Sequence, residues 1–331
     1  MRKIFILLSI TVVLFSCKKE INTNNVVKAD RNDLSVSVAP VAILAHSARP
    51  SDTDSTIDGP APGNATQYAY LPADASKRKP YLFIFIPGTT ASPDGYLKTV
   101  QSAASNGYYS FGVAYSDALP IEFYTGLFPN DKTTENILEE YLTGNNTSPN
   151  VDIGKPNGFE NRITKMILWL NTNYPAENWK QFLTADNQII WEKLSVAGHS
   201  QGSDHAMYMS KKRNLFRAGF IGGPGSFKLN NGKYPSFITN PGITPVENIY
   251  GLNHTKDLIR QWKDVQKVWQ ALGVPGTPNS IDDKNTGGSH RLTTSLPTND
   301  AHSYPVSDYV TPVDNNGKPL YAPVWAYMNY P

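Results

Sequence analysis

The chain has 331 residues, among them 30 Lys and Arg, 28 Asp and Glu, and a single cysteine. One cysteine excludes a scaffold held together by disulfides and a zinc site made of several thiolates. With 40% hydrophobic and 18% charged residues, the composition excludes wholesale disorder and is typical of a protein with a packed core.

The amino terminus has the pattern of a targeting segment. Within residues 1–17, two basic residues precede an apolar run of 12, which is shorter than the ~20 residues that a transmembrane helix needs. The segment ends in Leu-Phe-Ser-Cys, which resembles the lipobox of bacterial lipoproteins. The sequence therefore predicts a signal peptide over residues 1–16 and a lipid on Cys17. An ordinary signal peptide or a short anchor is the alternative.

Removal of residues 1–16 would leave 28 basic and 28 acidic residues, so the mature chain has no basic excess that would suggest nucleic acid as a partner. We expect the lipid on Cys17 to supply the membrane affinity. Two lysines follow this cysteine, which favours the outer membrane of a bacterial cell envelope. Residues 17–33 are predicted to be the lipidated cysteine and a flexible linker, and residues 34–331 a single domain.

In this domain, short apolar runs alternate with amphipathic stretches, which is typical of a mostly parallel α/β sheet with helices on both faces. Residues 116–158 form a long insertion that we expect to act as a lid or cap. Antiparallel strands are expected near 34–44 and 68–71. Parallel strands are expected at 81–86, 109–115, 194–197, 218–221, 248–252 and 291–295. Helices are expected at 94–105, at 159–174, from residue 199 to about 211, and after residue 252, where the helix begins near Leu258.

The segment Gly198-His199-Ser200-Gln201-Gly202 fits the pattern G-x-S-x-G. A short apolar strand precedes it and a helical pattern follows, which is the strand–turn–helix setting of a nucleophile elbow. Small residues two positions before and after the serine allow the strand and the helix to approach closely. The sequence therefore predicts Ser200 as a nucleophile. The alternative is a glycine-rich turn with an incidental serine.

A serine hydroxyl is a weak nucleophile and needs a positioned base. In enzymes built around such an elbow, an acid comes between the serine and the histidine in the chain. His254, His290 and His302 follow Ser200, but His254 precedes the best acid. His302 lies in the loop after the last predicted strand, where it can lean over the carboxyl edge of the sheet. We predict His302 as the base, with His290 as the alternative.

The acid of such a triad orients the imidazole and stabilises its charged form. Asp257 follows the penultimate predicted strand at the same edge, and we predict it as the acid. An aspartate at the start of a helix is also a good N-cap, which is the competing interpretation. The reserve candidates are Glu247, Asp282 and Asp283.

Acyl transfer also needs hydrogen-bond donors for an oxyanion. We expect one of them to be the backbone N–H of Gln201, directly after the nucleophile. The second is expected from the loop Pro87-Gly88-Thr89-Thr90, which leaves the most apolar strand of the chain, and it would be the N–H of either Thr89 or Thr90. A plain turn between a strand and a helix is the alternative for this loop.

The segments IFIPGTT and GHSQG, followed by Asp257 and then His302, resemble the α/β-hydrolase superfamily over roughly residues 65–330. Within it, the chain looks most like secreted bacterial serine hydrolases of the lipase and esterase kind, although it has Pro-Gly-Thr-Thr where many of these have His-Gly-Gly-Gly. The resemblance implies an α/β-hydrolase fold with an eight-stranded sheet and catalytic residues at its carboxyl edge.

The function that this resemblance implies is the hydrolysis of small or polymeric carboxylic esters through an acyl-enzyme, with no metal and no cofactor. An amidase, peptidase or acyltransferase on the same triad is the alternative among enzymes, because a fold does not determine the leaving group. A non-catalytic binding protein of the envelope is the alternative from another class.

Overall fold

The computed structural model describes residues 41–57, 59–117, 119–283 and 285–331. The predicted signal peptide, the lipid on Cys17 and the linker to residue 33 lie outside these residues and stay predictions. The described helices include none that is both long and apolar enough to cross a membrane.

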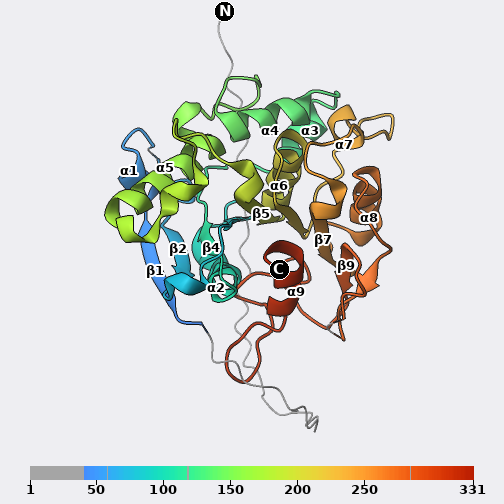
Figure 1. Ribbon diagram of the computed structural model, residues 1–331. Coiled ribbons are helices and arrows are strands. Elements are labelled where there is room, and N and C mark those ends of the chain that lie inside the picture. Colours follow the sequence, from blue (N-terminus) through green and yellow to red (C-terminus); the bar gives the residue numbers. More distant parts are fainter. Residues whose placement is uncertain (1–40, 58, 118, 284) are drawn as a thin grey trace, which may run out of the picture. The chain divides into compact units, whose positions relative to one another are not determined.

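A nine-stranded sheet runs through the described residues (Figure 1). Its spatial order is β1-β2-β4-β3-β5-β6-β7-β9-β8, in which β1 and β2 are antiparallel to their neighbours and the other pairs are parallel. The strands are β1 (Ile43–Ala48), β2 (Gln67–Pro72), β3 (Leu82–Ile86), β4 (Tyr109–Gly112), β5 (Leu194–His199), β6 (Arg217–Ile221), β7 (Ile249–His254), β8 (Asn279–Ser280) and β9 (Arg291–Thr294).

The predicted mostly parallel sheet is confirmed, but the expected number of eight strands is wrong. The additional strand is β8, whose two residues pair with Leu292 and Thr293 at the edge of the sheet. Two residues show no hydrophobic periodicity, so a sequence pattern cannot reveal such a strand. Strand β1 begins at Ile43 and so overlaps the end of the predicted range 34–44, of which residues 34–40 lie outside the described residues.

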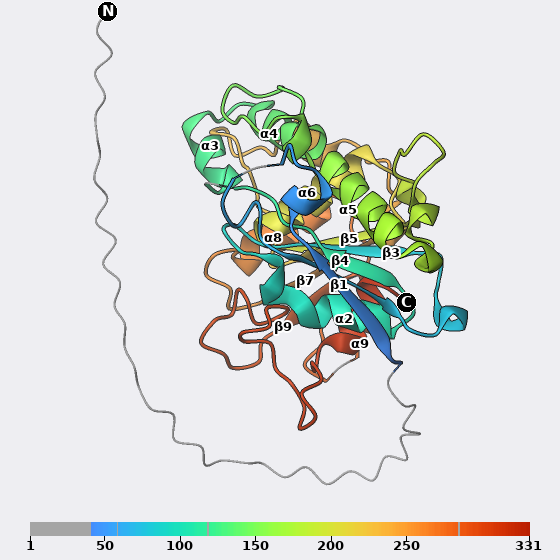
Figure 2. The same ribbon diagram turned by 90° about the vertical axis from the view of Figure 1, so that its left-hand side faces the viewer.

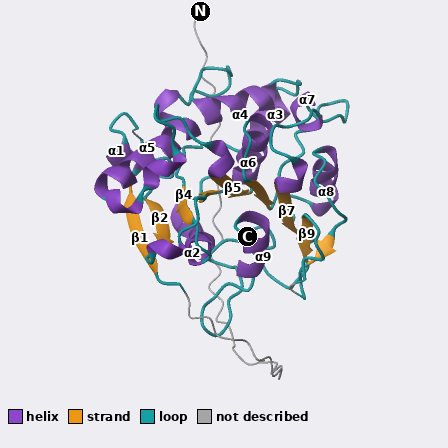
Figure 3. Cartoon of the chain, in the orientation of Figure 1, coloured by secondary structure: helices purple, strands orange, loops and turns teal. Residues whose placement is uncertain are grey.

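Helices cover both faces of the sheet, as expected (Figures 2 and 3). Figure 2 shows α5 on one side of the strands and α2 and α9 on the other. The helices are α1 (Pro50–Thr53), α2 (Leu97–Ser105), α3 (Ile121–Leu127), α4 (Thr133–Thr143), α5 (Phe159–Asn173), α6 (Gln201–Lys212), α7 (Ser236–Thr239), α8 (Trp262–Ala271) and α9 (Ala322–Asn329), with short 3-10 turns between them.

Strand β3 shows why a sheet covered on both faces has continuous apolar strands. Every side chain of β3 is buried, and they alternate between the two sides. Ile84 packs into the core with α5 and α6, whereas Phe83 and Phe85 pack into a second core with α2 and α9. Ile84 lies opposite Phe111 of β4 and Val196 of β5, so β3 is an interior strand of the sheet.

Several helices differ from expectation, and for two of them the physical reason is clear. The helix after β7 begins at Trp262 and excludes Leu258, which is 84% exposed. The intervening residues form a turn because Asp257 accepts the N–H groups of Ile259 and Arg260. Helix α9 was not expected at all. Its sequence, Ala-Pro-Val-Trp-Ala-Tyr-Met-Asn, is apolar on nearly all sides and so shows no helical stripe.

The insertion 116–158 contains α3, α4 and a 3-10 turn at Lys155–Asn157. It follows β4 and therefore starts at the carboxyl edge of the parallel strands. Figure 1 shows α3 and α4 beside α6, and α4 packs against both α5 and α6. The start of the insertion is thus close to the turn between β5 and α6.

Candidate active site

The chain has the α/β-hydrolase fold, and open sheets of this kind hold their ligands beyond the carboxyl ends of the parallel strands. Ser200 lies at this edge, in the turn between β5 and α6. Its backbone has φ 54° and ψ −119°, a conformation that residues other than glycine rarely adopt. The Ser200 N–H donates to the carbonyl of Ile221 at the end of β6, which helps to hold this turn.

This turn is possible because Gly198 and Gly202 have no side chains. A Cβ on Gly198 would lie 2.2 Å from the Gly202 carbonyl carbon, and one on Gly202 would lie 2.1 Å from the Ile86 carbonyl oxygen. Both contacts are with backbone atoms, which cannot rotate away. Strand β5, helix α6 and strand β3 therefore approach one another closely around Ser200.

The structure brings the predicted base and acid together. His302 Nδ1 lies 2.7 Å from Asp257 Oδ2, and the Asp257 side chain is fully buried. A carboxylate only accepts hydrogen bonds, so Nδ1 carries the proton and Nε2 is left as an acceptor. The other carboxylate oxygen accepts the N–H groups of Ile259 and Arg260, at 2.8 and 2.9 Å, which fixes the orientation of Asp257.

His199 contacts both the backbone and the ring of His302, with the two ring centroids 4.6 Å apart. Its Nε2 donates to the backbone carbonyl of His302 at 2.9 Å, so its Nδ1 accepts from the Tyr96 hydroxyl, also at 2.9 Å. Burial lowers the pKa of His199 to about 3, and the ring therefore stays neutral at physiological pH. Neither Tyr96 nor this contact of His199 was expected from the sequence.

A cavity of about 580 Å³ lies over these residues and is lined by both Ser200 and His302. Among the described residues, no hydrogen bond joins the Ser200 hydroxyl to His302. Catalytic hydrogen bonds are often long in enzymes without substrate and shorten when it binds. The candidate nucleophile Ser200 and the candidate base His302 thus line the same cavity.

The other residues that the sequence offers as base or acid do not line the cavity. His290 stacks on Tyr250 with ring centroids 3.9 Å apart and bonds to the carbonyl of Ile249, at the opposite end of β9 from the cavity. The carboxylate of Asp282 binds Thr294 and Ser295. Asp283 caps its own turn, and Glu247 lies in a 3-10 turn before β7. His254 bonds to the carbonyl of Leu296.

The structure distinguishes the two threonines of the expected oxyanion loop. The Thr90 N–H donates to both carboxylate oxygens of Asp117, at 3.0 and 3.1 Å, and is therefore occupied. The N–H groups of Thr89 and Gln201 have no partner among the residues that the structure describes. Gln201 is the first residue of α6, where the helix dipole also favours negative charge.

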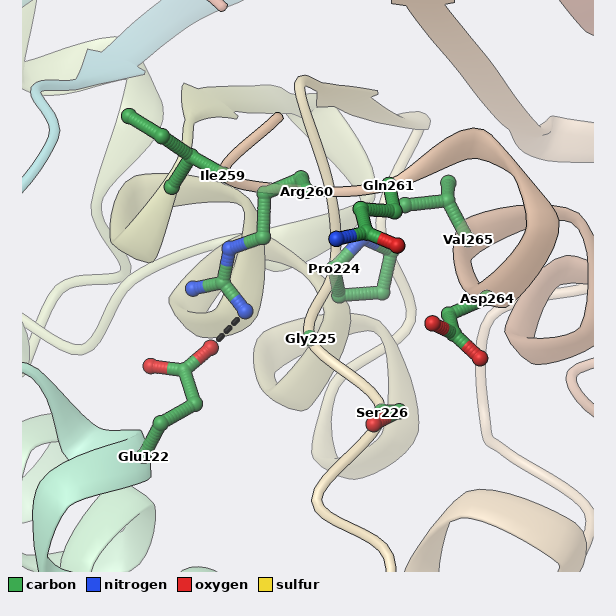
Figure 4. Close-up of a pocket in the computed structure, with 9 residues that line it drawn as sticks. All are labelled: Glu122, Pro224, Gly225, Ser226, Ile259, Arg260, Gln261, Asp264 and Val265. Carbon is green, nitrogen blue, oxygen red and sulfur yellow. Dashed lines mark ion pairs between the residues drawn. The ribbon is translucent and has the colours of Figure 1, made fainter. Parts of the chain in front are cut away.

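Figure 4 shows the residues that line a second, smaller cavity of about 230 Å³. Ile259 lines both this cavity and the first. At the centre of the second cavity, the buried Arg260 pairs with Glu122 of α3 and, at 2.8 Å, with Asp204 of α6. Burial lowers the pKa of Arg260 to about 10, which still leaves it charged at neutral pH. Arg260 therefore ties the turn that carries Asp257 to α6 and to the insertion.

Within residues 41–331, apart from the three positions left undescribed, no three or more His, Cys, Asp or Glu side chains gather closely enough to hold a metal ion.

No protein-family model matches the chain, and no curated protein matches it either. Many solved structures are similar to it, and three of them illustrate the level of similarity. A provisionally assigned dienelactone hydrolase from Klebsiella pneumoniae has 14% identity and a TM-score of 0.39, covering 84% of this chain and 94% of its own. Thermogutta terrifontis esterase 2, phosphoramylated by tabun, has 11% identity and a TM-score of 0.44, with 86% and 92% covered.

TT1662 from Thermus thermophilus has 13% identity and a TM-score of 0.36, covering 72% of this chain and 87% of its own. Similarities at this level do not transfer an activity. A proposal for the function of this chain therefore depends on its own residues.

Proposed function

We propose that this chain is a serine hydrolase that cleaves carboxylic esters through an acyl-enzyme. The observation that carries the proposal is the strained Ser200 at an elbow, facing a cavity shared with His302, whose Nδ1 is held by the buried Asp257. Backbone strain at a non-glycine residue is maintained only where the surroundings enforce it, and it clusters at reactive sites.

In the proposed reaction, the Ser200 hydroxyl oxygen attacks the ester carbonyl carbon while His302 Nε2 takes the hydroxyl proton. The carbonyl oxygen becomes an oxyanion that the N–H groups of Thr89 and Gln201 stabilise, and Asp257 stabilises the imidazolium. His302 then gives its proton to the leaving alcohol, and the acyl group remains on Ser200. A water molecule, deprotonated by His302, releases the acid and restores the serine.

A fluorophosphonate probe tests the nucleophile. We expect the probe to react with the purified protein, because such reagents phosphonylate activated serines, and mass spectrometry should place the adduct on the peptide containing Ser200. Ser200→Ala should not react. Ser307→Ala is the control, since Ser307 lines the same cavity and should leave the labelling unchanged. Labelling that persists in Ser200→Ala would contradict the proposal.

We also propose that the ester carries an extended apolar group. Two large side chains that line the cavity are exposed, Ile259 at 69% and Tyr309 at 78%, and Pro120, directly before α3, also lines it. Apolar side chains exposed together around a cavity are typical of a ligand surface. In this proposal, the beginning of the insertion 116–158 forms one wall of the substrate site and acts as its cap.

Ile259→Ser should raise the KM for an ester with a long acyl chain about 10-fold, which corresponds to about 1.4 kcal/mol of lost apolar contact. The KM for an acetyl ester of the same alcohol should stay the same, because the short acyl group does not reach the rim. Ile243→Ser is the matched control, since Ile243 is 58% exposed and does not line the cavity. Equal KM changes for both esters would contradict the assignment of the rim. Steady-state kinetics on the two esters measures this.

A further inference from the structure

Asp117 is a buried carboxylate that the triad does not use. It follows β4 at the carboxyl edge of the sheet and is only 4% exposed. Its two oxygens accept the N–H of Thr90, and Oδ2 also accepts from the Gln201 side-chain amide at 3.2 Å. One carboxylate thus binds both segments that carry the proposed oxyanion donors, although they are more than 100 residues apart in the chain.

The contact with Thr90 determines the conformation of the oxyanion loop. Thr90 has φ 58°, in the left-handed region that a β-branched residue adopts only when its surroundings hold it there. The hydrogen bond to Asp117 is the interaction that occupies its N–H. Since Thr90 directly follows Thr89, the direction of the Thr89 N–H depends on the same local backbone.

The hydrogen bond between Asp117 and the Gln201 side chain connects the oxyanion loop to the elbow. The side-chain oxygen of Gln201 accepts from the Thr89 hydroxyl at 3.3 Å and from the Ile121 N–H at 2.9 Å. Its amide nitrogen donates to Asp117. All of these polar groups are matched donor to acceptor, so the loop, the elbow and the start of α3 are held in one network.

We infer that Asp117 is a positioning residue that sets the separation and direction of the Thr89 and Gln201 N–H groups and thereby builds the oxyanion hole. This inference rests on the proposed ester hydrolysis. Asp117 acts through these two segments, because its carboxylate binds Thr90 and Gln201 and Asp117 does not line the cavity.

Only an ionised carboxylate satisfies both of its partners fully. The Thr90 N–H contacts both oxygens of Asp117, so the NH₂ group of an asparagine would face this donor in either orientation of the side chain. Burial raises the pKa of Asp117 to about 6, so assays at pH 8 observe the charged form.

The test compares kcat and KM for a soluble ester at pH 8. Asp117→Asn should lower kcat about 100-fold, because small displacements of catalytic groups have effects of this size, with KM changed less than about 3-fold. The rate of fluorophosphonate labelling should fall in parallel. A kcat equal to that of the wild type would overturn the inference.

A double variant separates positioning from loss of fold. Asp117→Asn combined with Gln201→Glu exchanges the carboxylate and the amide, so that the asparagine NH₂ again meets an acceptor, while the backbone N–H of residue 201 is kept. The double variant should recover at least about 10-fold in kcat over the single variants. If Asp117→Asn does not fold, the test is the kcat of the double variant compared with that of Gln201→Glu alone. Equal kcat values for these two proteins would overturn the inference.

Glu140→Gln is the matched control. Glu140 is also a buried carboxylate, 1% exposed, and accepts the N–H groups of Thr147, Ser148 and Ile153 in a loop away from the cavity. Its loss should lower Tm and leave kcat unchanged. An equal fall in kcat for both variants would mean general destabilisation and overturn the inference. A wild-type protein with no ester turnover and no labelling would instead overturn the proposed function.

Discussion

Asp257→Asn is expected to lower kcat for ester hydrolysis about 10⁴-fold while leaving the fold intact. The asparagine oxygen can still accept the N–H groups of Ile259 and Arg260, which the native Oδ1 binds at 2.8 and 2.9 Å. Its NH₂ group then replaces Oδ2, which lies 2.7 Å from His302 Nδ1. A donor at this position forces Nδ1 to accept, which moves the imidazole proton to Nε2. His302 can then no longer take the proton of Ser200.

Stopped assays of ester turnover, together with Tm from thermal unfolding, measure this effect. The control is Asp282→Asn, which changes one of the reserve acids, whose carboxylate binds Thr294 and Ser295 and which does not line the cavity. This variant should stay within a few-fold of the wild type. If Asp282→Asn loses activity and Asp257→Asn keeps it, the acid has been assigned to the wrong residue.

The positions of the triad candidates could be predicted because they depend on chain order and on strand direction. The carboxyl ends of parallel strands meet at one edge, so Ser200 after β5, Asp257 after β7 and His302 after β9 must lie near one another once the sheet forms. Their local conformations do not enter this argument. Whether His302 reaches Asp257 is a matter of loop geometry, which only the structure describes.

The choice between Thr89 and Thr90 could not be predicted, because it depends on a residue distant in the chain. The Thr90 N–H is occupied by Asp117, which lies 27 positions later. A signal was nevertheless present, since Asp117 closely follows a predicted strand at the same edge as the other candidates. An acidic residue at the carboxyl end of a parallel strand is therefore a candidate for a role in the site, even where the triad already has its acid.

The contacts of Arg260 could not be predicted from the sequence either. The pattern around residue 258 suggested a helix, whereas the carboxylate of Asp257 holds a turn there and Arg260 enters the interior to pair with Asp204. Buried ion pairs leave no periodic pattern in a sequence, because they depend on tertiary contacts between distant segments.

Gly202→Ala is expected to lower the free energy of unfolding by more than about 3 kcal/mol, since an added Cβ would overlap backbone atoms. That Cβ would lie 2.1 Å from the carbonyl oxygen of Ile86 and 2.6 Å from that of Pro87. Ile86 ends β3, a fully buried interior strand, so it cannot move without breaking its pairing with β5. Helix α6 would have to shift away from the sheet.

Denaturant unfolding measures this loss, and Gly126→Ala is the control. A Cβ on Gly126, which lies on α3, would have no atom within 4 Å, so this alanine should stabilise the helix by about 0.5–1 kcal/mol. An unfolding free energy of Gly202→Ala close to that of the wild type would contradict the close approach of α6 and β3. The same approach also brings the Gln201 N–H toward the loop after β3. Any folded fraction of Gly202→Ala should therefore also show a reduced kcat, because the two oxyanion donors lie on the two elements that the new side chain separates.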